Sequence, residues 1–133
     1  MACCGRAAAA TPGCSSASAQ SQNGNRLYVP GVGPDCLRRA FASCRTASLS
    51  VAGRGVDAQL TLSFTVGRKL GASRVFVTGS NTVFFGSKTR KTTWTGTCSS
   101  AKKRAEGVVL SGCSDGDYLL SPPGAPQVAN NRF

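Results

Sequence analysis

Apolar and polar residues alternate most clearly between positions 59 and 66. The apolar members are Leu60, Leu62, Phe64 and Val66, and the residues beside them are Gln59, Thr61, Ser63 and Thr65. This period of two predicts a half-buried strand. Val75 and Val77 alternate with Phe76 and Thr78 in the same way, so residues 67–71 are expected to form the basic turn of a hairpin. Residues 83–85 are expected to extend the sheet.

Two stretches have helical spacing. Leu37, Ala40, Phe41 and Cys44 recur at helical intervals, so a helix is expected over residues 36–45, with Asp35 as its N-cap. A second helix is expected over residues 99–110, with Ala101 and Ala105 facing inward and residues 102–104 facing outward. Residues 86–96 are polar and basic, and they predict a loop. Short strands are expected at residues 27–29, 49–51 and 118–120.

This order of elements predicts a small α/β fold. We expect a small mixed β-sheet with a long hairpin and two packing helices, within a single basic domain over residues 26–124. Residues 1–25 are rich in Ala, Ser and Cys and contain no acid, so they predict a disordered tail or a transit-like segment. Residues 125–133 are expected to be a flexible C-terminal tail.

The amino-acid composition then narrows the range of possible functions. The 133 residues include 16 Lys and Arg, 5 Asp and Glu and no His, for a formal charge of +11. Without His, a histidine base, a His-ligated metal and a Ser/His/Asp triad are excluded. A cysteine nucleophile would also lack its usual partner. We therefore expect a binding protein and not an enzyme, with no cofactor and no small-molecule substrate.

The positive charge favours a polyanionic partner, either nucleic acid or an anionic membrane. No apolar run approaches the roughly 18 residues of a membrane-spanning helix. The cations are also spread over several expected elements instead of one amphipathic helix. We therefore expect nucleic acid as the partner and no membrane.

The seven cysteines contain no Cys-x-x-Cys pair. We interpret them as buried thiols in a reducing compartment, with no bound metal. The alternative is a four-cysteine metal site. Its ligands would be Cys36, Cys44, Cys98 and Cys113.

The expected loop at residues 86–93 is the strongest candidate for RNA contact. Long cations beside short hydroxyls are the groups that contact phosphate and ribose. Trp94, which follows, could stack on a base or pack in the core, and Gly31-x-Gly33 before the first helix could cradle a phosphate. The expected RNA-binding residues are Gly31, Gly33, Arg68, Lys69, Lys88, Arg90, Lys91, Thr92, Lys102, Lys103 and Arg104.

Two segments carry a resemblance to a known family. Residues 30–41, with Pro30-Gly31-Val32-Gly33, Asp35 and then Arg39-Ala40-Phe41, resemble a signature of the universal small-subunit ribosomal protein eleven family. Residues 85–92 resemble that family's basic loop, which contacts ribosomal RNA. The family places its hairpin before the Pro-Gly helix, so the resemblance implies a circular permutation, and the family's basic C-terminal tail is missing here.

The resemblance implies a ribonuclease H-like platform fold and a structural role in the small ribosomal subunit. The implied partners are ribosomal RNA and neighbouring small-subunit proteins. The expected location is a mitochondrial ribosome, or else another organellar or a cytoplasmic ribosome. The first alternative is a viral capsid or other genome-associated basic structural protein. A second is suggested by the helix-then-hairpin order, which also resembles the C-terminal domain of energy-transducing periplasmic proteins of the TonB type.

Overall fold

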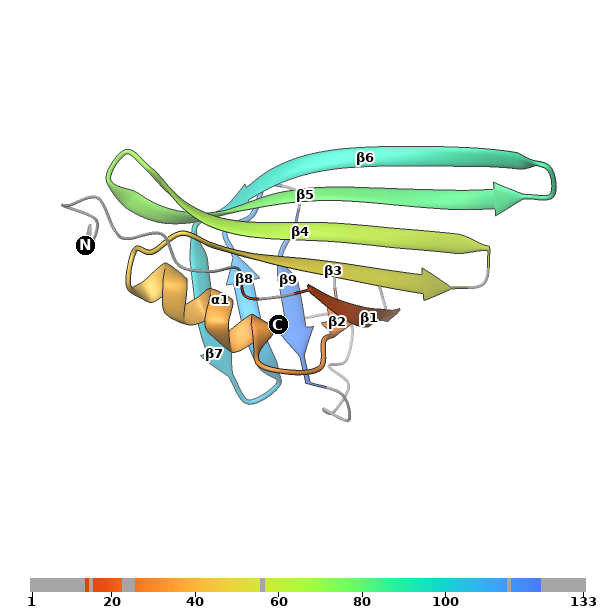
Figure 1. The fold of residues 1–133 in the computed structure, drawn as a ribbon. Helices are drawn as coiled ribbons and strands as arrows, with labels where there is room; N and C mark the ends of the chain where they lie inside the picture. The colour runs from red at the N-terminus through yellow and green to blue at the C-terminus, as the bar shows by residue number, and fades with distance from the viewer. Residues whose placement is uncertain (1–13, 15, 23–25, 56, 115, 123–133) are drawn as a thin grey trace.

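The structure is a computed structural model that describes residues 14, 16–22, 26–55, 57–114 and 116–122 (Figure 1). This part of the chain contains nine strands and one helix. The helix is α1 (Gly33–Ala42). The strands are β1 (Ser16–Gln22), β2 (Arg26–Tyr28), β3 (Ala47–Gly55), β4 (Ala58–Lys69), β5 (Ala72–Phe85), β6 (Lys88–Cys98), β7 (Ser100–Arg104), β8 (Gly107–Ser111) and β9 (Tyr118–Ser121).

Hydrogen bonds join the strands in the order β6-β5-β4-β3-β1-β2-β9-β8-β7. Strands β3 to β6 are antiparallel neighbours and form the long half of the sheet. Strand β1 runs parallel to β3 and antiparallel to β2, and β2 runs parallel to β9. Figure 1 shows the long half crossing above β7, β8 and β9, with α1 beside these three strands.

The hydrophobic core lies between the long half of the sheet, α1 and the strands β7–β9. The period-two pattern buries one face of β4 and β5 and exposes the other, as their alternating burial shows. The largest fully buried apolar side chains include Phe64, Leu27, Leu37, Leu49, Leu110, Leu119 and Leu120. The expected β4–β5 hairpin is therefore confirmed, as are the short strands at β2, β3 and β9.

The first helix is confirmed, but its start is not where the sequence indicated. The helix begins at Gly33, and Val32 is its N-cap, without a capping side chain. Gly31 has a φ of +85°, and Pro34 occupies the first turn, where a missing N–H costs nothing. Asp35 therefore lies inside the first turn and is not the N-cap.

The second expected helix is wrong. Residues 100–111 form the β7–β8 hairpin, in which Lys102 pairs with Val109. Gly107 closes its turn at a φ of +141°, where a Cβ would overlap the carbonyl oxygen of Leu120. Residues 108–110 then form a continuous buried run that pairs with β9. The α/β class with two packing helices, including the ribonuclease H-like platform type that the resemblance implied, is therefore overturned by a mostly β structure, with one helix in the described residues.

The expected basic loop at residues 86–96 is also wrong. Gly86, with a φ of +58°, and Ser87 form a tight turn, and the chain then returns as β6. β6 pairs with β5 from Phe85–Lys88 to Val75–Cys98. Its many threonines are β-branched and favour an extended strand.

Part of the expected N-terminal tail is a strand, because residues 16–22 form β1. The expectations for the rest of residues 1–25, for 125–133 and for the transit-like segment lie outside the described residues. The helix in the described ranges has 10 residues, and it is not long and apolar enough to span a membrane.

The described cysteines form disulfides and are not thiols. Cys14 is bonded to Cys36, and Cys98 to Cys113; no described cysteine is free. The expectation of buried thiols is therefore wrong. The alternative metal site is overturned as well, because three of its four ligands lie in these two bonds. The paired positions are 22 and 15 residues apart, so no short motif marked them.

Candidate nucleic-acid interface

The four strands β3–β6 contain no acidic residue. Their cations are Arg54, Arg68, Lys69, Arg74, Lys88, Arg90 and Lys91. A surface with charges of one sign creates a positive potential that attracts polyanions. The long half of the sheet is therefore the best candidate surface for nucleic acid.

At one end of this half, β5 and β6 extend past β3 and β4 and past the layer below (Figure 1). We call the end of the β5–β6 hairpin, residues 80–93, the arm; residues 80–83 still pair with β4, and residues 84–89 extend past it. Every residue from 84 to 93 is exposed. At its tip, Phe84 and Phe85 are 36% and 60% exposed. The arm can therefore approach a partner from either face.

The arm carries three of the expected RNA-binding cations, but on two faces. Lys91 pairs with Thr82, whereas Arg90 pairs with Val83 and Lys88 with Phe85. Because side chains alternate along a strand, Lys91 lies on one face, and Lys88, Arg90 and Thr92 lie on the other. An acidic residue, Asp57, lies beside the arm just before β4, where its backbone carbonyl accepts a hydrogen bond of 2.8 Å from the Phe84 N–H.

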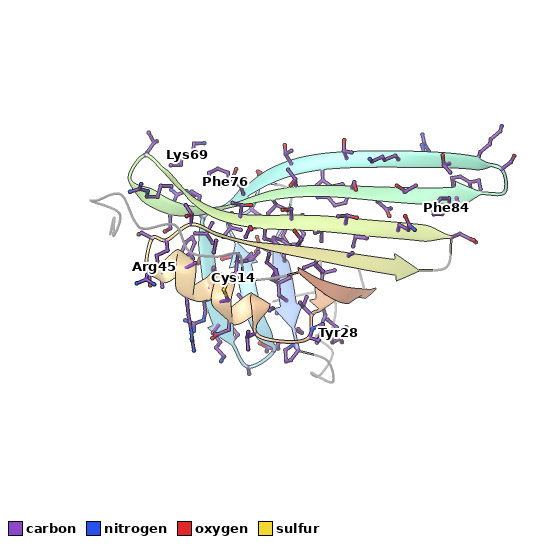
Figure 2. The ribbon with its side chains drawn as sticks, in the orientation of Figure 1. Cys14, Tyr28, Arg45, Lys69, Phe76 and Phe84 are labelled. Atoms are coloured by element: carbon purple, nitrogen blue, oxygen red, sulfur yellow. A yellow bond between two sulfur atoms is a disulfide. The ribbon has the colours of Figure 1, made fainter. Side chains whose placement is uncertain are left out.

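The structure does not bring the other expected cations to the arm. Lys69 pairs with Ala72 at the far end of the hairpin, whereas Ala58 pairs with Val83 in the arm. At about 3.3 Å per residue, these two ends of β4 are about 35 Å apart. Figure 2 labels Lys69 at this far end, above Arg45. Arg68 and Lys69 therefore lie apart from the arm and, as neighbours on a strand, on opposite faces of the sheet.

The cations of β7 form a third group, beside the helix. Lys103 and Gly31 line a pocket of about 170 Å³ that is mostly apolar and also includes Asp35, Val108 and Leu120. Lys102 and Arg104, like Lys103, are exposed.

Asp35 already has cationic partners at this pocket. Its carboxylate accepts hydrogen bonds from Arg38 and lies 2.9 Å from the Arg39 Nε. The hydrogen bonds from Arg38 lower the pKa of the Asp35 carboxyl, burial partly opposes them, and the positive charges of Arg38, Arg39 and Lys103 lower it further. The carboxylate also reduces the attraction of Lys103 for an anion here.

The two glycines expected to cradle a phosphate have different surroundings. Gly33 is buried, and a Cβ there would lie 2.7 Å from the Cδ1 of Leu49, so its small size serves packing. Gly31 has open space around its α-carbon and a positive φ, and it shapes the loop before α1.

Trp94 packs against the core, which decides between the two roles left open for it. Its indole N–H donates a hydrogen bond of 3.2 Å to the hydroxyl of Tyr118. The Tyr118 ring in turn meets Phe64 edge to face at 5.4 Å. This contact chain joins β6 to β9 and β4.

Sequence reasoning missed the face of β3–β6 that lies away from the core, which we call the outer face. Its hydroxyl-bearing residues are Ser48, Ser50, Thr61, Ser63, Thr65, Thr78, Ser80, Thr82, Thr89, Thr93, Thr95 and Thr97. In one row across the sheet, Ser50, Ser63, Thr78 and Thr95 are paired neighbours. The alternation that predicted the core residues of β4 also marked their hydroxyl neighbours.

Comparison with protein-family models, with curated proteins and with solved structures finds no match for this chain, so its function is argued from the geometry alone.

Proposed function

We propose that this protein is a structural RNA-binding protein that contacts folded RNA through the arm. The observation that carries the proposal is a hairpin end with three exposed cations, of which Lys88 lies beyond β4, on a sheet half whose strands contain no acid. Arg and Lys on an exposed strand can reach phosphates. The neighbouring threonine hydroxyls can contact phosphate and ribose.

Two kinds of assembly are compatible with this role. The sequence resemblance favours a small ribosomal subunit, in a mitochondrion or elsewhere, with ribosomal RNA and neighbouring proteins as partners. The alternative is a capsid or other genome-associated structural protein. The Cys14–Cys36 and Cys98–Cys113 disulfides favour the alternative, because disulfides persist in oxidising environments and on virion surfaces.

The first experiment measures how RNA affinity depends on salt. If Lys88, Arg90 and Lys91 each neutralise one phosphate, they should contribute about −2 to the log–log slope for a single strand. Substitution of all three by Ala should remove this contribution. Arg90→Ala alone should reduce the slope by about 0.7.

Arg45→Ala is the matched control, because it removes the same charge from an exposed arginine next to α1 and far from the arm. It should leave the slope close to that of the wild type. Equal slopes for Arg90→Ala and the wild type, or no RNA binding at low salt, would refute the proposal.

A second experiment distinguishes the two assemblies. The purified chain is mixed with RNA and sedimented, and a lysate is fractionated in parallel. Regular RNA-containing particles would support a genome-associated structural protein. Co-sedimentation with small ribosomal subunits would support the ribosomal role.

A further inference from the structure

We infer that the outer face is a platform for single-stranded RNA, on which a base stacks on Phe76 and the neighbouring hydroxyls contact ribose. This inference rests on the proposed function and specifies its ligand. The arm supplies charge, whereas the outer face would select unpaired RNA over DNA.

Phe76 is the central group of this platform. It is a large apolar residue on the face of β5 away from the core, and it is 36% exposed. Its ring occupies the space above Gly67 on β4, where a Cβ would come within 2.8 Å of the ring Cε2. The missing side chain at Gly67 therefore lets the ring rest against the sheet. A ring held in this way loses little freedom when a base stacks on it.

Hydroxyl groups surround Phe76 in register. Thr65 pairs with it on β4 and Thr97 on β6, and the next row contains Ser63, Thr78 and Thr95. A hydroxyl both donates and accepts hydrogen bonds, as does the ribose 2′-OH. DNA lacks this group. The rows therefore offer contacts that a deoxyribose strand cannot make.

The charges on the outer face suit one phosphate chain running along β5. Arg74 lies two residues from Phe76 on the same face, and Lys91 pairs with Thr82 in the arm. Phe84 lies on the same face, eight residues or about 27 Å beyond Phe76. Figure 2 labels Phe76 and Phe84 near opposite ends of β5. Since β3–β6 contain no acid, no carboxylate of these strands opposes the phosphates along this path.

These features favour a single strand over a duplex. Stacking on an aromatic ring requires an unpaired base, and it contributes about 1–3 kcal/mol per base by alanine substitution, which is about 5- to 150-fold in affinity. A duplex would present its phosphates but not its base faces.

The test measures binding of a labelled oligouridylate and of the matching deoxyuridine oligomer, each about ten nucleotides long. The RNA should bind more tightly than the DNA. Phe76→Ala should weaken RNA binding about 5-fold or more, while Phe76→Tyr, which keeps a stacking ring, should largely preserve it. Gly67→Ala should also weaken binding, because the new Cβ displaces the ring.

Leu70→Ala is the matched control, because it removes an exposed large apolar side chain from the β4–β5 turn, outside the arm and away from Phe76. Leu70→Ala should change RNA affinity less than Phe76→Ala. Circular dichroism of each variant tests whether the fold is retained, and Phe76→Tyr provides the comparison if Phe76→Ala unfolds.

The outcomes separate this inference from the proposed function. If folded Phe76→Ala binds RNA like the wild type, or if RNA and DNA bind equally, the platform is overturned while the arm proposal stands. If neither oligomer binds at low salt, both fail. Preferential binding of a duplex would also overturn the platform.

Discussion

Gly79 lies on the core face of β5, and because it has no side chain the Trp94 ring can occupy the space above it. The two residues are paired neighbours, and a Cβ at position 79 would overlap the indole ring. Trp94 holds its place through its hydrogen bond to Tyr118. Gly79 therefore determines how closely the Trp94 ring on β6 can pack against β5.

We predict that Gly79→Ala destabilises the protein by about 1–3 kcal/mol, because the ring must move out of a packed position. Urea denaturation measures the change in the free energy of unfolding. Ser80→Ala, one residue further and on the outer face, should stay within about 0.5 kcal/mol of the wild type. An equal effect of the two substitutions would contradict the packing of Trp94.

The hydrogen-bonded ion pair of Asp35 predicts that the stability of the fold depends on pH. Its pKa is lowered in the folded state by the hydrogen bonds from Arg38, so the ionised carboxylate stabilises the fold above its ordinary pKa of 3.8. This contribution is lost as the pH falls through the lowered pKa. Asp35→Asn should therefore reduce stability at neutral pH, by no more than about 1 kcal/mol for a partly exposed pair.

The measurement is the free energy of unfolding of both proteins between pH 7 and acid. The difference should shrink below the ordinary pKa of the carboxyl. A difference that is constant with pH would show that the ion pairs do not cause the effect.

Among the elements, the sequence predicted those strands that have one buried and one exposed face. The alternation at Leu62 and Phe64 is a direct consequence of such a position. The arm part of β6 has solvent on both faces, so residues 88–93 show no alternation and resemble a loop. Only the pairing with β5 defines this strand.

The β7–β8 hairpin was missed for a different reason. Ala101 and Ala105 have helical spacing, but local preference is weak compared with tertiary pairing. Val109 pairs with both Lys102 and Leu119, so β8 lies inside the sheet. For the candidate site, the sequence identified the cations of the arm but not their faces, because these depend on the strand register.

The Cys98–Cys113 disulfide joins the end of β6 to the segment after β8, across 15 residues. We predict that replacing both cysteines by Ala costs about 3 kcal/mol, since a loop of this length restrains the unfolded chain by about that amount. Urea denaturation of the double variant measures the loss. A variant as stable as the oxidised wild type would contradict a structural role for this bond.

At the scale of the whole molecule, the net charge of +11 destabilises the folded state and also attracts an anionic partner. Like charges repel more strongly in the compact state than in the extended chain, and salt screens this repulsion. We predict that the melting temperature of the free protein rises as sodium chloride increases from low concentration to about 0.15 M. RNA binding should weaken over the same range.

Thermal denaturation monitored by circular dichroism tests this dependence. Sucrose, which carries no charge, is the control for general solvent effects. A melting temperature that falls with salt would show that attractive ion pairs outweigh the repulsion.

The position of β2 between β1 and β9 also has a kinetic consequence. Arg26, near the start of the described chain, pairs with Leu119, near its end. A nascent chain cannot complete its sheet until the last strand has been synthesised. Pairings between residues so distant in sequence raise the contact order, and domains dominated by them fold in milliseconds to seconds. Until β9 is synthesised, β2 lacks one of its two neighbouring strands. The newly made protein is therefore prone to aggregation until its sheet is complete.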